Sequence, residues 1–485
     1  MRKLIVIAGI PIDDLNMDQA LDRLGEFIAT GRPHQIATVN ADFIVRAWDD
    51  PELRHILQDA DLLTADGMPL VWGARLLGVP LEGRVTGADM VPALAERAAR
   101  QGWRIYFLGA RPGVAARAAE ILTTRHPTLQ VAGVYSPPLS TIFDMEPDLL
   151  DRIRQTRPDI LLVAFGNPKQ EKWIHMHLQE LGVPVCIGIG GTFDFIAGEV
   201  RRAPPWMQTS GLEWLYRLLQ EPRRMWRRYV VDIFQFGRFF LAQWVRQAGG
   251  RKFEPLTLPE KAANGTPASA PLRLSGALTV ANRENFQKQI EIALAQTPSL
   301  SLDLSGVTFM DSASLGALVA LSKAARAAGG DLVLTHLQPN VRRSIELLRL
   351  DRFFNLGEAP EPHTEALGVA SPAGAWKVYR MPPRLEVTNA QAIRAALESE
   401  VAASPRLIAD FHQTEFLDSS GIAVMLATHR QAASKGGELR QAGLGRDLRR
   451  TLELAGMHHV FHLYENLESA SQTPFSPPPT ERSSP

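Results

Sequence analysis

The chain has 485 residues, which is too long for one ordinary domain and predicts two to four. Its hydrophobic content of 45% supports packed cores, and its 52 basic and 52 acidic residues give a formal net charge of zero. This balance argues against nucleic acid as a partner, because such binding depends on a basic surface. The only cysteine, Cys186, cannot form a disulfide within the chain, which favours a reducing cytoplasm.

The first residues, 1–8, form a short apolar run that superficially resembles a signal peptide. The run leads into Pro11 without a small-residue cleavage site, so we interpret it as a first strand. No stretch of about 18 uninterrupted apolar residues occurs, and no membrane-spanning helix is predicted.

Residues 1–200 alternate short apolar runs with amphipathic stretches, which predicts a Rossmann-like α/β domain with a parallel sheet. The expected strands are 36–39, 104–108, 160–165 and 185–189, and the expected helices are 88–101, 114–125 and 169–181.

The most informative motif is Asn167-Pro-Lys-Gln-Glu171, directly after the apolar run 159–165. A continuously apolar run indicates a buried parallel strand, and the carboxyl edge of such a sheet is where ligands bind. Lys169, an amide and a carboxylate together suit a ligand with phosphates and hydroxyls, such as a nucleotide sugar. An ordinary capped turn is the alternative interpretation.

Three more polar groups follow apolar runs: Thr38 with Asn40, Asp66 in a Gly-Met-Pro turn, and Arg84 before the helix at Asp89. A general base for a sugar hydroxyl is a carboxylate or a histidine at the mouth of a cleft. Asp66 fits this description, although the same residue could simply cap a helix or form a turn.

Two glycine-rich turns, 107–113 and 188–194, could approach a phosphate closely, or could serve only tight helix–strand packing. Neither has the full G-x-G-x-x-G spacing, so a dinucleotide-binding dehydrogenase is not supported. His175 and His177 lie two apart on a predicted helix and point to different faces, and we expect no metal site.

Residues 201–248 are rich in Arg and aromatic residues and predict a membrane-associating appendage. At helical spacing one face is apolar and the other carries arginines, as in a helix that lies in the membrane interface. Packing on the protein's own core is the alternative. The residues expected to contact the membrane are Trp226, Tyr229, Ile233, Phe240 and Trp244.

The rest of the chain is an internal repeat with an offset of 107 residues (410 minus 303), which pairs Asp303 with Asp410. Each copy predicts strand, helix, strand, Asp-Ser turn, helix, strand and helix. The expected boundaries are linker 249–270, first copy 271–357, linker 358–376, second copy 377–468 and disordered tail 469–485, after a core of 1–200 and the appendage 201–248.

In the first half, the ordered motifs resemble the WecG/TagA/CpsF glycosyltransferases, glycosyltransferase family 26. They are Thr38-x-Asn40, Ala65-Asp66-Gly67, Gly87-Ala-Asp89, Asn167–Glu171, Gly191-Thr-Phe-Asp194, Arg202-Ala-Pro204, Glu213–Arg217 and Glu221–Arg224. The resemblance implies an inverting transfer of a sugar from a UDP donor to a lipid-diphosphate-linked sugar, for cell-surface polysaccharide synthesis. It also implies that the enzyme is peripheral on the cytosolic face of the membrane and uses neither a metal nor another cofactor. Donor sugar remains open among N-acetylmannosamine, its uronic acid and glucose.

The resemblance assigns roles to individual residues. Asp66 is implied to be the base that deprotonates the acceptor hydroxyl. Thr38, Asn40, Arg84 and Gln170 are implied to contact the donor or acceptor, while Arg217 and Arg224 could stabilise the leaving UDP. The remaining motif residues are expected to bind substrate or shape the site; these are Asn167, Lys169, Glu171, Asp194 and Arg202.

The repeated domains resemble STAS domains, the fold of anti-sigma-factor antagonists. The resemblance rests on 309–312 and on 416–421, with glycine pairs before the next strand. In regulatory members the second serine of Asp-Ser-Ser-Gly is implied to be phosphorylated; that position is Ser420 in the second copy and Ala313 in the first. The first copy is therefore expected to be a docking or structural module, and a partner protein is expected for the pair. The alternative function is a STAS-based regulatory scaffold with an inactive nucleotide-sugar-sensing domain.

Overall fold

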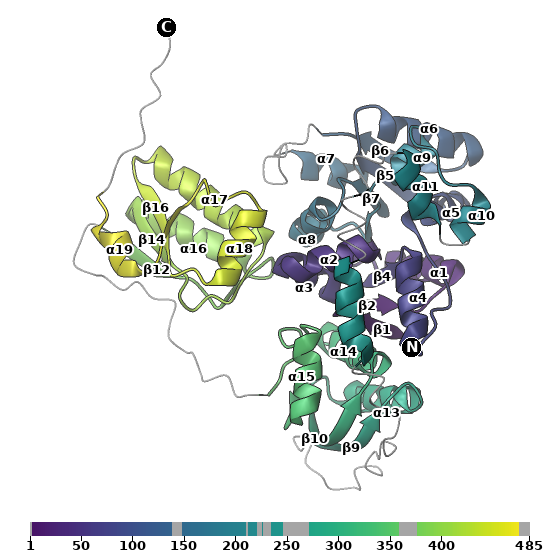
Figure 1. Ribbon diagram of the computed structural model, residues 1–485. Helices are drawn as coiled ribbons and strands as arrows, with labels where there is room; N and C mark the ends of the chain where they lie inside the picture. Colours follow the sequence, from purple (N-terminus) through teal and green to yellow (C-terminus); the bar gives the residue numbers. More distant parts are fainter. Residues whose placement is uncertain are drawn as a thin grey trace. The chain divides into compact units, whose positions relative to one another are not determined.

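The computed structural model describes residues 2–137, 148–209, 212–220, 226, 234–245, 271–357 and 376–474 (Figure 1). The chain divides into two compact units, residues 1–48 with 54–360, and residues 361–485 with 49–53. The predicted linker 249–270 and residues 358–375 of the second linker lie outside the described residues, as do 475–485 of the tail.

The first unit contains a six-stranded, all-parallel sheet in the order β4-β3-β8-β7-β5-β6. Its strands are β3 (His34–Val39), β4 (Leu62–Ala65), β5 (Arg104–Gly109), β6 (Gln130–Tyr135), β7 (Ile160–Ala164) and β8 (Val185–Gly188). The four strands expected from the sequence are all present, so the predicted parallel α/β fold is confirmed. The carboxyl ends of β3, β4, β7 and β8 meet at one edge, where an open α/β sheet binds ligands.

Helices cover both faces of this sheet (Figure 1). They are α1 (Met17–Thr30), α2 (Ala41–Asp49), α3 (Pro51–Asp59), α4 (Met68–Leu76), α5 (Gly87–Gln101), α6 (Val114–Arg125), α7 (Leu149–Thr156), α8 (Lys169–Leu181) and α9 (Thr192–Ile196). Alternate strand residues face different cores: Phe107 packs with α1, α5 and α6, whereas Leu108 packs with α7 and α8. The strands other than β6 are therefore buried on both faces, which explains their mostly apolar sequence, whereas the edge strand β6 is partly exposed.

The apolar start of the chain forms β1 (Leu4–Ile7), which pairs antiparallel with β2 (Ile10–Asp13) in a separate hairpin. The expected strand exists, but it does not join the parallel sheet. β2 faces the β4 edge of that sheet, where the Asp13 carboxylate accepts a hydrogen bond from the Leu63 backbone at 2.8 Å. Arg2 binds the same carboxylate with two hydrogen bonds, of 2.7 and 2.9 Å.

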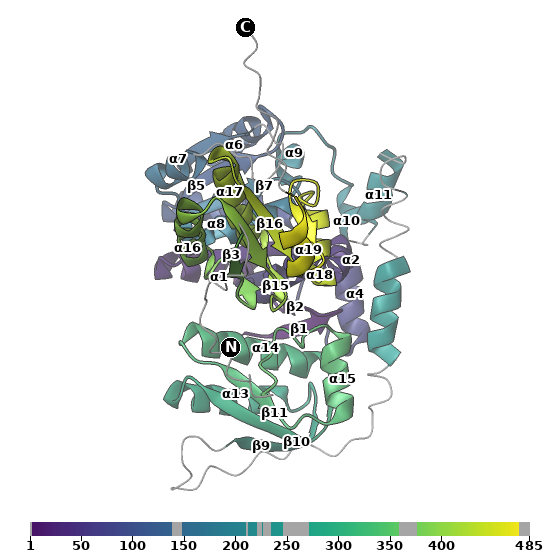
Figure 2. The ribbon, with the colours of Figure 1, turned by 90° about the vertical axis from the view of Figure 1, so that its left-hand side faces the viewer.

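The first repeat packs within the same unit. Its elements are β9 (Leu272–Leu278), α13 (Arg283–Gln296), β10 (Leu300–Met310), α14 (Ser312–Ala327), β11 (Leu332–Thr335) and α15 (Pro339–Leu347), in a parallel sheet ordered β11-β10-β9. Figures 1 and 2 show α14 beside the β1–β2 hairpin. Leu4 and Val6 of β1 belong to the apolar core of this repeat.

The second repeat forms the other unit. It contains β12 (Lys377–Arg380), β13 (Arg384–Leu385), α16 (Ala390–Ala403), β14 (Arg406–Asp410), β15 (Phe416–Leu417), α17 (Ser419–Ser434), β16 (Glu438–Ala442), α18 (Arg446–Leu454), β17 (His462–Tyr464) and α19 (Leu467–Gln472). Its main sheet is parallel, in the order β12-β14-β16-β17. α19 extends into the stretch expected to be disordered from residue 469, because Asn466 caps it with a reciprocal capping box. Trp376, assigned to the second linker, is buried against Arg440, whose guanidinium lies 3.8 Å from its ring.

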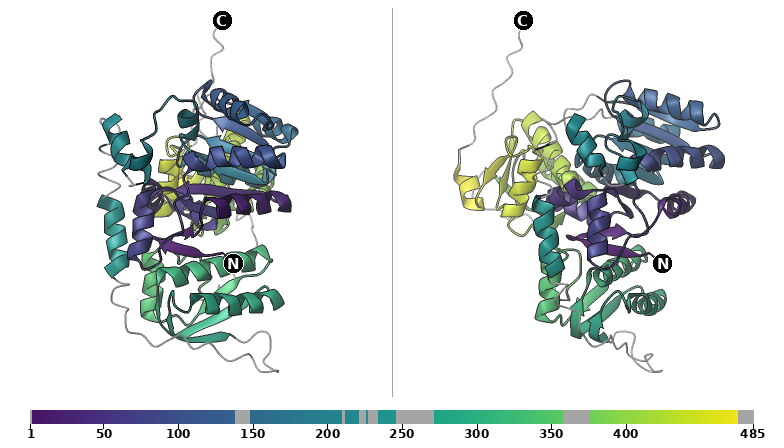
Figure 3. Two further views of the ribbon diagram at one scale, coloured as in Figure 1. Left: turned by 90° about the vertical axis from the view of Figure 1, so that its right-hand side faces the viewer. Right: turned by 45° about the vertical axis from the view of Figure 1, so that its right-hand side comes forward.

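The Arg- and aromatic-rich segment is described in part. It contains α10 (Pro205–Thr209), α11 (Glu213–Gln220) and a helical stretch at 234–245. Figure 3 shows this stretch, in teal, running beside α4. Phe236 and Phe239 are buried, and the Phe239 ring stacks on Trp48 of α2 at 3.8 Å. No helix in the described part of the chain is long and apolar enough to cross a membrane.

Candidate active site

A cavity of ≈ 880 Å³ opens at the carboxyl ends of β3, β4, β7 and β8. Its polar lining includes six residues that the sequence predicted for the site: Thr38, Asn40, Asp66, Asn167, Gln170 and Asp194. These residues lie at or after the carboxyl ends of four different strands, β3, β4, β7 and β8, and only the parallel sheet brings them together.

Asp66 lies on the cavity wall immediately after β4 and is half-buried. Its backbone N–H donates to the Val39 carbonyl at 2.7 Å, and one carboxylate oxygen accepts from the Gly87 N–H at 3.3 Å. Gly67 follows with a φ of 149°, a conformation that favours glycine, and α4 then turns away from the cavity. The carboxylate is therefore held in place while it faces the cavity.

The segment that carries Gly87 is fastened to the end of β4. The Thr64 hydroxyl donates to the Val85 carbonyl at 2.9 Å, and the Val85 N–H donates to Ala65 at 3.0 Å. A side chain at Gly87 would crowd the hydroxyls of Thr192 and Thr38, at 3.2 and 3.4 Å from its Cβ. Glycine at this position therefore lets α5 begin directly beside the site.

The first turn of α2 forms another wall. The Asn40 side chain accepts the Phe43 N–H at 3.3 Å, and Arg46, one helical turn further on, donates to both oxygens of Asp42 at 3.0 Å. Asn167 reaches across from the end of β7 and donates to Asp42 at 3.4 Å. Asn40, Asp42, Arg46 and Asn167 all line the cavity.

Gln170 is fixed on the cavity floor. Its side-chain oxygen accepts two backbone N–H groups, from Gly166 at 3.1 Å and Gly190 at 3.0 Å, so it joins the ends of β7 and β8. Its amide nitrogen donates to Glu171 at 2.7 Å. Burial raises the pKa of Glu171 to about 7, although the hydrogen bond from Gln170 opposes this effect.

Four charged residues form a network beside the cavity. Arg202 donates to both oxygens of Asp89 and lies 3.6 Å from Glu213, which also lies 3.7 Å from Arg84. Burial disfavours the charged form of Asp89, but hydrogen bonds from Arg202 and Thr86 outweigh it and lower the pKa of this carboxyl. Glu213 lines the cavity, and the network attaches α11 to the start of α5.

Arg111 lies on the opposite side, in the turn after β5. It donates to Asp194 at 3.1 Å and to Glu199 at 3.5 Å. All three residues line the cavity, so the mouth carries a cation that Asp194 orients.

Other predicted residues lie elsewhere. Lys169 is exposed outside the lining, and Glu171 is buried beneath Gln170. Arg84 and Arg202 contact lining residues without lining the cavity themselves. The side chain of Arg217, on α11, and the whole of Arg224 lie outside the described residues.

Sequence reasoning missed Arg46, Arg111 and Glu213 as site residues. A signal existed for each. Arg46 follows Asp42 at the i, i+4 spacing of a helical ion pair, Arg111 stands between two glycines of a turn already singled out, and Glu213 belongs to a quoted motif.

The predicted membrane residues are only partly described. Trp226 and Trp244 are exposed. Phe240 is half-buried, because its ring packs on α4, where a Cβ added to Gly73 would lie 3.1 Å from it. Tyr229 and Ile233 lie outside the described residues.

The Asp-Ser turns of the two repeats occupy matching positions. Asp311 caps α14 by accepting the Ser314 N–H at 2.8 Å, and Asp418 caps α17 by accepting the Gly421 N–H at 2.9 Å. Ala313 and Ser420 therefore both lie in the first turn of the helix that follows.

Comparison with known proteins identifies the families of both parts of the chain. Residues 5–250 match the family described as "Glycosyl transferase WecG/TagA/CpsF family", and residues 261–362 and 370–470 match the STAS domain. A similar protein from Bacillus spizizenii is called N-acetylglucosaminyldiphosphoundecaprenol N-acetyl-beta-D-mannosaminyltransferase; it is 35% identical over 193 residues, covering 40% of this chain and 73% of that protein. A protein of the same name from Bacillus subtilis is 32% identical over 224 residues, which cover 46% of this chain and 85% of that protein.

Among solved structures, an anti-sigma factor antagonist from Mycobacterium paratuberculosis is 28% identical, with a TM-score of 0.20, covering 21% of this chain and 87% of that one. A putative anti-sigma factor antagonist from Thermotoga maritima is 16% identical, with a TM-score of 0.21; the match covers 22% of this chain and 92% of that one. The family matches identify a glycosyltransferase domain followed by two STAS domains. The chain belongs to the WecG/TagA/CpsF family.

Proposed function

We propose that this enzyme transfers N-acetylmannosamine from a UDP donor to a sugar attached through a diphosphate to a polyprenyl lipid. The donor sugar and the acceptor follow from the names of the two Bacillus relatives. The observation that carries the proposal is the position of Asp66, a carboxylate held at the wall of a polar cavity where the strands of the sheet end.

Asp66 acts as the general base. The acceptor hydroxyl gives its proton to the Asp66 carboxylate while its oxygen bonds to C1 of the donor sugar. The bond between C1 and the diphosphate oxygen breaks, and UDP leaves with the electron pair. One displacement of this kind inverts the configuration at C1. A carboxylate that is already fixed by the Gly87 N–H loses little freedom in reaching this geometry.

The leaving diphosphate gains negative charge as the bond breaks. Arg46 and Arg111 line the cavity, and Arg84 and Arg202 lie at its edge, so fixed guanidinium groups can stabilise this charge without a metal. The family resemblance gives Arg217 and Arg224 of the appendage, whose side chains lie outside the described residues, the same role. Thr38, Asn40, Asn167 and Asp194 supply hydrogen bonds to the sugars and the nucleotide.

The acceptor's lipid anchor requires the enzyme to reach a membrane. The helical stretch 234–245, which belongs to the unit that holds the cavity, exposes Phe234, Leu241, Trp244 and Val245. We propose that this face enters the cytosolic surface of the membrane as a peripheral anchor and delivers the acceptor to Asp66.

UDP release by the purified full-length protein tests this function. The assay uses detergent and an N-acetylglucosaminyl-diphosphate-lipid acceptor, with UDP-N-acetylmannosamine, its uronic acid analogue and UDP-glucose as donors. We expect release only with acceptor, fastest with N-acetylmannosamine, unchanged by EDTA, with an inverted linkage by NMR. Asp66→Asn should lower kcat by about 100-fold or more, as expected for loss of a general base. Asp351→Asn, an exposed residue of the first STAS domain, is the matched control.

Each arm has a separate consequence. Acceptor-dependent release that survives in Asp66→Asn would remove this residue as the base but keep the transferase. UDP release with another donor would change only the proposed identity of the donor sugar. No release from any donor, with folded protein, would favour the scaffold function over the enzyme.

A further inference from the structure

We propose that the β1–β2 hairpin of the transferase is a docking surface for the first STAS domain of the same chain, and that it is shaped to reject the second. The contact is made by α14, the helix that starts at the Asp-Ser turn (Figures 1 and 2). The first copy makes this attachment with the face of α14 that carries Gly316.

Glycines on both sides let the two backbones touch. A Cβ on Gly316 of α14 would lie 2.2 Å from the Leu4 carbonyl oxygen, and a Cβ on Gly9 of the hairpin turn would lie 2.2 Å from that of Leu348. No real side chain fits at such a distance, and both obstacles are backbone atoms that cannot rotate away. Around Gly316 the helix is lined by Ala313, Ala317 and Ala320, which are all buried.

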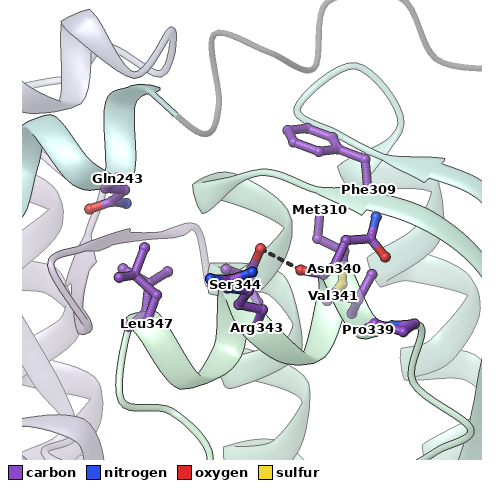
Figure 4. Close-up of a pocket in the computed structure, with 11 residues that line it drawn as sticks. Gln243, Phe309, Met310, Pro339, Asn340, Val341, Arg343, Ser344 and Leu347 are labelled. Carbon is purple, nitrogen blue, oxygen red and sulfur yellow. Dashed lines mark hydrogen bonds between the residues drawn. The ribbon is translucent and has the colours of Figure 1, made fainter.

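A buried amide locks the contact. Gln243, from the helical stretch 234–245, accepts the Ala8 N–H at 2.8 Å and donates to the Val6 carbonyl at 2.7 Å and to the Ser312 hydroxyl at 2.5 Å. One side chain thus joins the hairpin, the appendage and the Asp-Ser turn. Gln243 also lines a cavity of ≈ 420 Å³ beside α15 (Figure 4).

Arg349 adds an anchor at an energetic cost. It has a φ of 52°, in the left-handed region that costs a residue with a Cβ about 1 kcal/mol. Its guanidinium donates to the Trp48 carbonyl at 2.7 Å and lies 4.5 Å from the Trp48 ring. This conformation ends α15, where the Arg349 N–H donates to the Glu346 carbonyl at 2.9 Å, so the contact with Trp48 uses a residue that the end of the helix already fixes.

The second copy lacks these features. At the 107-residue offset Gly316 corresponds to Ala423, and Arg349 corresponds to Gly456, which has a φ of 71°. A methyl group at the first position would collide with Leu4, and glycine at the second relieves the strain but makes no contact with Trp48. The hairpin therefore accepts a STAS helix with glycine at this position and excludes one with alanine.

The test uses the full chain with a protease site inserted within 249–270. After cleavage, the wild-type halves should remain together in size-exclusion chromatography. Gly316→Ala should separate them, and Gly237→Ala, a helical glycine with open space around it, should leave them together. Because Ala423 stands at this position in the second copy, the substitution is compatible with a STAS helix.

Arg349→Gly keeps the test independent of folding, since glycine suits the left-handed backbone. It should weaken the association of the cleaved halves by about tenfold or more, because a hydrogen bond and a cation–π contact are both lost. Lys288→Ala, at an exposed site on α13, is its control. Wild-type halves that separate on cleavage, or halves of Gly316→Ala and Arg349→Gly that bind as tightly as wild type, would overturn the proposal.

Discussion

Glu171 is a buried carboxyl with a raised pKa directly below the cavity floor. It is buried beside Gln170, its second oxygen has no hydrogen-bond partner among the described residues, and burial raises its pKa from 4.5 to about 7. A Cβ on Gly188 would lie 2.6 Å from its other oxygen, so the carboxyl fills space that only glycine leaves open. We infer that Glu171 supports Gln170 from below and does not contact substrate.

The raised pKa makes stability depend on pH. Between pH 4.5 and about 7 the unfolded carboxyl releases a proton that the folded one keeps, so the free energy of unfolding falls as pH rises through this window. A shift of this size corresponds to roughly 3 kcal/mol. Glu171→Gln should remove this decrease in the free energy of unfolding, while its amide oxygen still accepts the hydrogen bond from Gln170. Urea unfolding at a series of pH values measures it; equal pH slopes for the two proteins would show that the carboxyl titrates normally.

The sequence predicted site residues where they follow strands directly. Asp66 and Asn167 each come one to three residues after a buried apolar run, and parallel strands deliver their carboxyl ends to one edge. It could not show that Glu213 and Asp89 bind Arg84 and Arg202 at the edge of the cavity. Those partners come from segments whose approach depends on the tertiary fold.

At the scale of elements, helices and strands of the parallel sheet followed the predicted periodicity, whereas 234–245 did not. The sequence predicts one apolar face that includes Phe240 and Trp244, but such a face can pack on the protein or on a membrane, so the sequence does not tell which residues face the protein. The structure buries Phe236 and Phe239 and leaves Leu241 and Trp244 exposed. The position of the β1–β2 hairpin could not be predicted either. An apolar run indicates that a strand is buried, but not that it packs against α14, some 300 residues further along the chain.

The exposed side of 234–245 gives a sharper membrane test than Phe240, which packs on α4. Leu241→Asp with Trp244→Asp should greatly reduce co-sedimentation with anionic liposomes, because two charges would replace the apolar contacts of an interfacial helix. The pair Val280→Asp and Ile292→Asp, on exposed parts of the first STAS domain, controls for added charge. Equal sedimentation of both double variants with wild type would contradict membrane insertion of this face.

At the scale of the whole molecule, the apolar cores show which parts should unfold together. Leu4 and Val6 of the transferase hairpin belong to the core of the first STAS domain, and β2 is tied through Asp13 to the edge of the catalytic sheet. The second STAS domain has a core of its own, around Trp376, Val378 and Ile408. Loss of packing in the first STAS domain should therefore destabilise the active site, whereas loss of packing in the second STAS domain should leave the stability of the active site unchanged.

Two matched substitutions test this distinction. Phe286 and Phe411 are both fully buried, in the first and second STAS domains, and truncation of such a residue to alanine costs about 3–5 kcal/mol. Phe286→Ala should lower the temperature at which transferase activity is lost, because undocking of the first STAS domain exposes Leu4 and Val6. Phe411→Ala should unfold its own domain earlier while transferase activity is lost at the wild-type temperature. If both variants inactivate at the wild-type temperature, the first STAS domain does not support the catalytic sheet. If both inactivate early, the second copy stabilises the transferase as well.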